Sequence, residues 1–265
     1  MSLLYDLYQP GDSWLHRLDP RVKFIFVLCA SLLLLLMRSL WVMLIALVGA
    51  QLILLSGGIS WRRIGWVWRM TLPTMVLIAV LWVIFYPGEG QALLSWRFLR
   101  ITPYNIAEGL AVALRIGALA FILFIWLFST SQSALIRGLV ALGLPYTWGL
   151  TLAMALRYLP TMAGIFQLIS DAQRARALEL DQGNPLRRAR AHLPIVVAML
   201  ITALRTAQNL SLALASRAFG AQRKRTHLHP LHFRPLDGLL LAGILLATAA
   251  LLWARLALGL GQEPL

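Results

Sequence analysis

The stretch "SDAQRARALELDQG", from Ser170 to Gly183, decides the architecture that the sequence predicts. It reads as a polar helix that carries arginines and acids, although most of the chain is strongly apolar. Hydrophobic residues make up 60% of the 265 residues, and charged residues make up 13%. That charged share is about half of the ~25% found in soluble domains. The composition indicates an integral membrane protein, so this charged helix calls for a special explanation.

The net charge of +14 has a topological explanation. In a soluble protein it would suggest nucleic acid as a partner. In a membrane protein, Lys and Arg accumulate in cytoplasmic loops. Between Thr130 and Arg234 there are 13 Lys and Arg residues against three acids. We therefore expect no nucleic-acid partner and a cytoplasmic location for this segment. The single cysteine, Cys29, excludes an internal disulfide.

Five apolar runs predict membrane spans, and they cover residues 22–37, 40–56, 70–87, 106–128 and 236–258. The first two runs are slightly shorter than the ~20 residues that cross a bilayer. They form either two short spans in a hairpin or one re-entrant element. We favour the hairpin, because Arg38 at the bilayer centre would cost several kcal/mol. Whether both runs cross fully stays open. Asp19 is expected to cap the first span, with Pro20 at its first helical position.

Charged flanks predict a cytoplasmic N-terminus, because basic residues favour the inner side. The basic residues before the first span and after the second are Arg17, Arg21, Lys23, Arg62, Arg63 and Arg69. Arg97 and Arg100 fall on the outer side and count against this orientation. The expected organisation is an N-terminal membrane part (1–129), a cytoplasmic block (130–234), and a final transmembrane helix with its tail (235–265).

The cytoplasmic block is expected to hold long helices. Prolines suit a first helical turn, so Pro145 and Pro160 are expected to open helices that stop at Gly183. A second stretch is expected to run from Pro194 to Gly220. It is nearly apolar enough to span, but polar residues interrupt it about every two turns. The pattern favours a long amphipathic helix with small residues along one side.

Two similar triplets lie near the ends of these predicted helices. The first is Ala175-Arg176-Ala177, and the second is Ser216-Arg217-Ala218. Small flanking residues would let each guanidinium project into a groove on another protein, where its planar fork can bond carboxylates and carbonyls. The alternative is that each cation merely complements the helix dipole, for ~0.3–1 kcal/mol. The repeat of the triplet favours a docking role.

At these residues the chain resembles the T components, the transmembrane coupling subunits of energy-coupling factor transporters. "HRLDPRVKF" (16–24) is similar to the family's entry to its first span. The run "ALGLPYTWGLTLAMALRYLPTMAGIFQLISDAQRARALE" (141–179) resembles the approach to the family's first arginine motif, and "ASRAFG" (215–220) resembles the second. The resemblance covers nearly the whole chain.

The resemblance implies an all-α integral membrane protein with about five transmembrane helices. A cytoplasmic coupling domain of two long crossed amphipathic helices would lie between the fourth and fifth spans. Two ABC-type ATPases would dock at Ala175, Arg176 and Ala177 and at Ser216, Arg217 and Ala218. The membrane part would hold a small S component, which binds a vitamin or a transition-metal ion. ATP and Mg would be bound by the ATPases, and this chain would bind no cofactor. The location would be a prokaryotic plasma membrane.

One departure from the family pattern concerns the third motif residue. The family usually has glycine there, whereas this chain has Ala177 and Ala218. If the glycine lets a partner's backbone approach, these alanines are expected to loosen the fit slightly without removing the arginines.

Other readings find less support. His227, His229 and His232 lie close together, but they lack a recognised metal-ligand spacing, so no metal site is expected. No Gly-rich phosphate loop and no nucleophile beside a base is present, which argues against a membrane enzyme. The permease subunit of another ABC importer remains an alternative, although its ATPase contact would be one short loop.

Overall fold

The computed structural model describes residues 8–86, 94–96, 99–176, 184–220 and 233–258. Within these residues the helices are joined by turns and short connections, and one short antiparallel hairpin pairs Leu94–Trp96 (β1) with Leu99–Ile101 (β2). The contacts divide the chain into two units, one built around residues 145–230 and the other around residues 6–144 and 231–265. The expected all-α fold is confirmed, and the small hairpin was not predicted.

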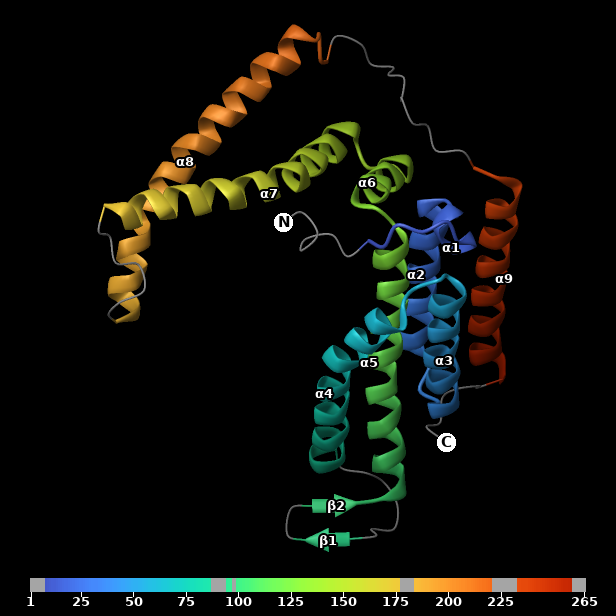
Figure 1. The fold of residues 1–265 in the computed structure, drawn as a ribbon. Coiled ribbons are helices and arrows are strands. Elements are labelled where there is room, and N and C mark those ends of the chain that lie inside the picture. The colour runs from blue at the N-terminus through green and yellow to red at the C-terminus, as the bar shows by residue number, and fades with distance from the viewer. Residues whose placement is uncertain (1–7, 87–93, 97–98, 177–183, 221–232, 259–265) are drawn as a thin grey trace. The chain divides into compact units, whose positions relative to one another are not determined.

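The second unit is a bundle arranged around α5, as Figure 1 shows. Its helices are α1 (Trp14–Arg17), α2 (Pro20–Leu36), α3 (Leu40–Ser56), α4 (Trp61–Phe85), α5 (Pro103–Ser129), α6 (Gln132–Ala141) and α9 (Pro235–Leu258). α5 packs against α2, α3 and α4, while α9 packs against α2. Many buried residues of α5 are Ala or Gly, and such small residues let neighbouring helices approach closely.

The core of this bundle is apolar and lies along α5. Phe121, Ile125 and Phe128 of α5 are almost completely buried, together with Met43 and Leu54 of α3. The N-terminus of α5 is fixed by its sequence, since the Thr102 side chain accepts a hydrogen bond from the backbone N–H of Asn105 and Pro103 follows at the first helical position.

The predicted cap of the first membrane helix is confirmed. Asp19 is the N-cap of α2, its side chain accepts a hydrogen bond from the Arg21 backbone N–H, and Pro20 opens the helix. α2 and α3 are two separate helices, as the favoured hairpin requires. Arg115 Nη2, from the middle part of α5, donates a hydrogen bond of 2.6 Å to the Met37 carbonyl at the end of α2. This bond holds the connection between α2 and α3 against α5.

The third span begins earlier than the apolar run that predicted it. The run started at Met70, whereas α4 starts at Trp61 and includes the basic stretch before Met70. The difference arises because an apolar run marks only the part of a helix that suits lipid, while the helix itself continues through its charged end.

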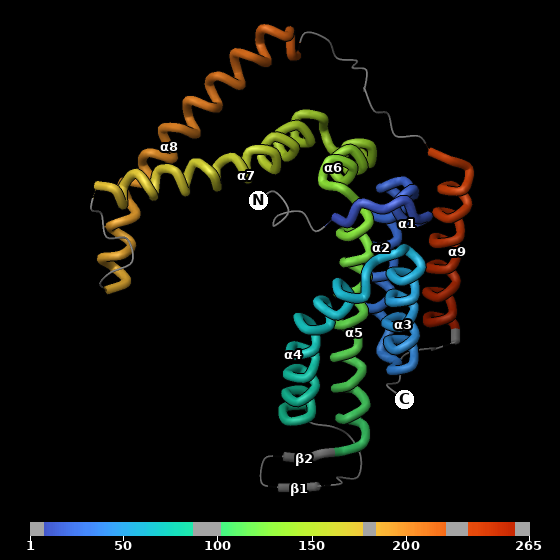
Figure 2. Tube along the Cα trace, viewed as in Figure 1, coloured from blue at the N-terminus to red at the C-terminus, as the bar shows by residue number. Residues whose placement is uncertain are grey.

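The other unit contains two long helices, α7 (Tyr146–Ala175) and α8 (Pro185–Ser216), which contact each other and cross (Figure 1). Two predicted helix starts are wrong, because Pro160 lies inside α7 and Pro194 lies inside α8. An interior proline removes one hydrogen bond and bends a helix, but it need not end it. Figure 2 shows α8 bending between its first and last turns.

The predicted helix ends were also too late. α7 ends at Ala175, well before Gly183, which lies outside the described residues, and α8 ends at Ser216 rather than at Gly220. In both cases the helix ends at the arginine triplet itself. The glycines further along the chain, Gly183 and Gly220, were mistaken for the helix stops.

Length and composition mark five described helices as able to cross a membrane. They are α4, α5, α7, α8 and α9, whereas α3 is apolar but shorter, with 17 residues. The list includes the two helices that we expected to lie in the cytoplasm. Their exposed faces would suit either lipid or a protein partner, so their cytoplasmic location stays a prediction.

Candidate functional site

Arg176 lies at the C-terminal end of α7. It is the C-cap residue, with φ −88° and ψ 20°, and its backbone N–H bonds to the carbonyl of Gln173. Ala175 is the last helical residue, and both side chains are exposed. Ala177, the third residue of the predicted motif, lies outside the described residues.

Arg217 occupies the same position at the end of α8. It is the C-cap residue, with φ −93° and ψ 16°, and Ser216 is the last helical residue. Ser216, Arg217 and Ala218 are all exposed. The two arginines therefore share both their place relative to a helix end and their backbone conformation, within a few degrees.

Both motif arginines have exposed side chains. Arginine carries its charge at any physiological pH and offers five donors in a planar fork. An exposed fork at a helix end suits a carboxylate or a row of carbonyls on another protein.

The residue after Arg217 explains the third position of the motif. Ala218 has φ +53°, in the left-handed region that favours glycine. Its N–H bonds to the carbonyl of Ala215, and the N–H of Phe219 bonds to the carbonyl of Leu214. These two bonds form a Schellman cap, in which the residue after the C-cap turns left-handed.

The same cap is present after α3 and after α6, with glycine in the left-handed position. Gly143 after α6 has φ +118° and Gly58 after α3 has φ +73°, and each has the two corresponding hydrogen bonds. Ala218 thus has the left-handed conformation that glycine has in the corresponding caps at Gly58 and Gly143. The glycine usual in the family at this position has a local reason in the backbone.

Ala218→Gly is expected to stabilise the end of α8 by about 0.5–1 kcal/mol, because the relief of left-handed strain exceeds the entropic cost of glycine. Partner association should change only modestly, since Arg217 keeps its place. Thermal unfolding in detergent measures the first effect. The matched control is Gly143→Ala, whose new Cβ would meet open space, so its effect is purely one of backbone strain. It should destabilise; a stabilising Gly143→Ala would contradict the interpretation.

Comparison with known proteins assigns the chain to a family. The family model CbiQ, described as cobalt transport protein, matches residues 11–228. The chain belongs to this family. The curated relatives bear the name "Energy-coupling factor transporter transmembrane protein EcfT". That of Acidaminococcus fermentans is 32% identical over 244 residues, 88% of this chain and 89% of the relative. That of Brevibacillus brevis is 30% identical over 260 residues, 94% of this chain and 96% of the relative.

The expected resemblance is therefore confirmed, and the chain is a T component of an energy-coupling factor transporter. It is a multi-pass membrane protein and a subunit of a transport complex. The match to the family model includes both arginine motifs, at the ends of α7 and α8.

The T component also contains a buried polar cluster that the sequence did not reveal. Asp237, in the first turn of α9, is 2% exposed. Its Oδ2 accepts a hydrogen bond of 3.0 Å from the Arg234 backbone N–H, which precedes α9. Its Oδ1 accepts one of 3.2 Å from the backbone N–H of Asp19, the N-cap of α2. One carboxylate thus binds the N-terminal ends of two helices, where helix dipoles favour negative charge.

Lys23 completes this cluster with positive charge. It is 4% exposed, and its Nζ donates a hydrogen bond of 2.9 Å to the carbonyl of Ser129, the last residue of α5. The carboxylates of Asp19 and Asp237 are near enough to attract its charge. The ammonium therefore complements the negative end of α5, and the carboxylates complement the positive ends of α2 and α9. We call Asp19, Lys23 and Asp237 the capping cluster.

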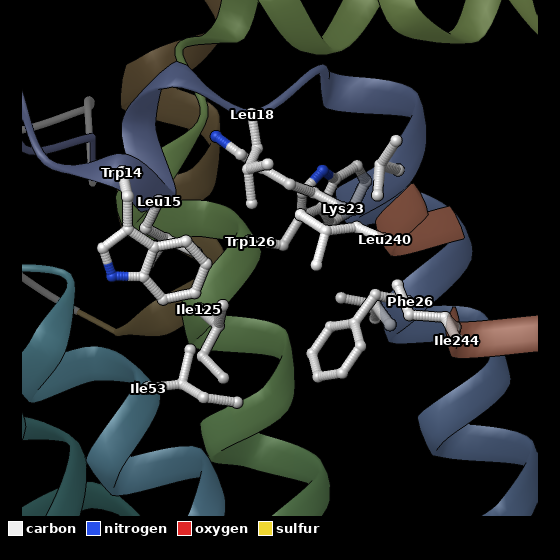
Figure 3. Close-up of a pocket in the computed structure, with 12 residues that line it drawn as sticks. Trp14, Leu15, Leu18, Lys23, Phe26, Ile53, Ile125, Trp126, Leu240 and Ile244 are labelled. Atoms are coloured by element: carbon white, nitrogen blue, oxygen red, sulfur yellow. The ribbon is translucent and has the colours of Figure 1, made fainter. Parts of the chain in front are cut away.

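An apolar pocket of about 160 Å³ lies beside the capping cluster. Figure 3 shows side chains of α1, α2, α3, α5 and α9 around it, among them Trp14, Phe26 and Leu240. Lys23 also lines it, so its aliphatic stem lies on apolar surface while its Nζ reaches backbone carbonyls. The pocket separates α9 from α3 and α5, which makes the contacts of Asp237 more important for holding α9.

The sequence also singled out two other groups of residues. Arg115 bonds the end of α2, and the buried Glu108 lies near enough to attract its charge, so both have a structural role. His227, His229 and His232 lie outside the described residues. In the part of the T component that the structure describes, His, Cys, Asp and Glu form no group of three or more that could hold a metal.

Proposed function

We propose that this T component couples two ABC-type ATPases to a small substrate-binding membrane protein, the S component, for the import of a vitamin or a transition-metal ion. The observation that carries this proposal is the equal placement of Arg176 and Arg217. Each is the C-cap of one of two crossed helices, and their backbone angles agree closely. Two equal docking elements suit a pair of related partners, one arginine for each ATPase.

The exposed apolar surface of α8 supports a second contact. Leu193, Val196, Leu200 and Leu204 follow a helical spacing, and each is more than half exposed. An apolar stripe of this kind needs a cover of lipid or protein. In this proposal it faces the S component and the lower surface of the bilayer. The helix ends with their arginines then remain free for the ATPases.

The mechanism follows from two long helices that cross. If the ATPases move closer together on binding ATP, the helix ends that dock on them move too, and the angle at the crossing changes. The apolar stripe transmits this change to the S component, which tips in the membrane and releases its cargo inside. In this mechanism ATP and Mg bind to the ATPases and the cargo binds to the S component. The T component itself is not catalytic.

This function requires a particular topology. The N-terminus lies in the cytoplasm of a prokaryotic cell, the chain crosses the plasma membrane several times, and residues 130–234 face the cytoplasm as the coupling domain. The excess of Lys and Arg in that segment supports this orientation.

Purification of the tagged T component from its native membrane in mild detergent tests the proposal. Mass spectrometry should recover two ATPase subunits, identical or different, and a small apolar membrane protein whose cargo can then be determined. Recovery of the folded T component without any ATPase would contradict the proposed coupling. ATPases without a small membrane protein would instead favour an ordinary permease role.

A further inference from the structure

The segment that follows α8 contacts the beginning of α7. The ring of Phe219 lies 6.3 Å from that of Tyr146, centroid to centroid, with an interplanar angle of 32°. Tyr146 is the first residue of α7, and Phe219 follows the end of α8. Aromatic rings at 4.5–7 Å attract each other beyond their burial of apolar surface. This contact joins two points that are far apart along the chain.

The cap geometry links this ring contact to the second motif arginine. Phe219 is the residue whose N–H closes the Schellman cap on Leu214, so its backbone is fixed relative to α8. Arg217 and Ala218 lie inside the same cap. Once the Phe219 ring is held by Tyr146, the short segment that carries Arg217 has little freedom to move relative to either helix.

We propose that Phe219 and Tyr146 form a clasp that positions Arg217 for docking on its ATPase. The proposal rests on the function proposed above and adds two positioning residues to it. The arginine fork needs a defined direction for paired hydrogen bonds. The free end of a helix frays, because its last carbonyls lack helical partners. A clasp that orders this end in advance lowers the entropic cost of binding.

The contact between Tyr146 and Phe219 would also transmit movement during coupling. It connects the start of one coupling helix with the end of the other, next to a docking arginine. A displacement of the ATPase at Arg217 would therefore reach α7 through Tyr146 as well as through the helix crossing. The loss of the clasp should weaken docking at Arg217 while leaving Arg176 unaffected.

The test measures the affinity of the purified ATPase pair for the full-length T component in lipid nanodiscs. Phe219→Ala and Tyr146→Ala should each weaken binding about five-fold, and the double variant should be no weaker than either single variant. Tyr146→Phe keeps the ring and should restore normal affinity, whereas a loss of fold would not be rescued in this way. Phe166→Ala, which removes a partly exposed ring from the same helix, is the matched control and should bind normally.

Two outcomes separate this inference from the function on which it rests. If Arg217→Glu reduces binding but Phe219→Ala leaves it unchanged, the clasp is overturned and the docking role stands. If Arg217→Glu itself binds normally, the proposed function fails. Strictly additive losses for Phe219→Ala and Tyr146→Ala would also overturn the clasp, because the two residues would then not act as a pair.

Discussion

Replacing Arg176 and Arg217 together by glutamate is expected to abolish the association of the T component with its ATPases while leaving its insertion in the membrane intact. Each change removes a fork of donors from the end of α7 or α8 and would place a negative charge against partner groups that bind a cation. Losing one partner of a buried charge pair costs about 2–5 kcal/mol at an interface. Two such losses lower the affinity by roughly a thousand-fold or more.

Co-purification with quantitative mass spectrometry measures this loss. The matched control is Arg157→Glu with Arg205→Glu, which makes the same charge change on exposed arginines inside the same two helices. The control should retain both ATPases, because these positions are not at a helix end. Retention of the ATPases by the Arg176→Glu, Arg217→Glu variant would remove the docking assignment. Equal loss in both variants would mean that overall charge, not the motifs, governs association.

The capping cluster gives the second large effect, on stability. Lys23→Met is expected to destabilise the bundle of α2, α5 and α9 by about 1.5–3 kcal/mol, because the Ser129 carbonyl loses its charged hydrogen-bond donor and the carboxylates of Asp19 and Asp237 lose a nearby positive charge. Methionine has a similar length and keeps the wall of the apolar pocket filled, so the loss reports charge rather than packing. Unfolding in mixed detergent micelles measures it.

Two further variants test that explanation. Adding Asp237→Asn to Lys23→Met should recover part of the lost stability, since a buried carboxylate that has lost a nearby positive charge is then neutral. Arg62→Met, which removes an exposed cation at the start of α4, should change stability little. If Lys23→Met were as harmless as Arg62→Met, the cluster would not be holding α9.

Runs of apolar residues in the sequence were enough to predict most of the membrane helices. Runs of apolar residues located α2, α3, α5 and α9 to within a few residues, since lipid and core both select such residues. The resemblance of the motif regions predicted the crossed pair of long helices, α7 and α8. The interior positions of Pro160 and Pro194 were not predicted. Proline occurs in the first turn of helices and also inside long helices that bend, and the sequence alone did not distinguish these two cases.

The details of the site depend on contacts between distant residues, which a single sequence does not show. Asp237 meets Asp19 across 218 positions in the chain, and neither residue carries a local pattern that points to the other. The clasp of Tyr146 with Phe219 is similar in this respect. One signal for the helix ends was available. The family usually has glycine at the third position of the motif, and glycine often follows a helix end in the left-handed conformation. This pattern could have placed the end of each helix at its arginine.

The central claim is that the two helix ends touch the two ATPases, and site-directed cross-linking tests it most directly. Cys29 is the only cysteine, so Cys29→Ser gives a background for Ala175→Cys and Ser216→Cys, which keep both arginines. A thiol-linked photoreactive group at either site should cross-link to an ATPase in the assembled complex, whereas Gln167→Cys and Gln208→Cys inside the same helices should not. Cross-links to ATPase from the interior positions but not from the helix ends would contradict the account.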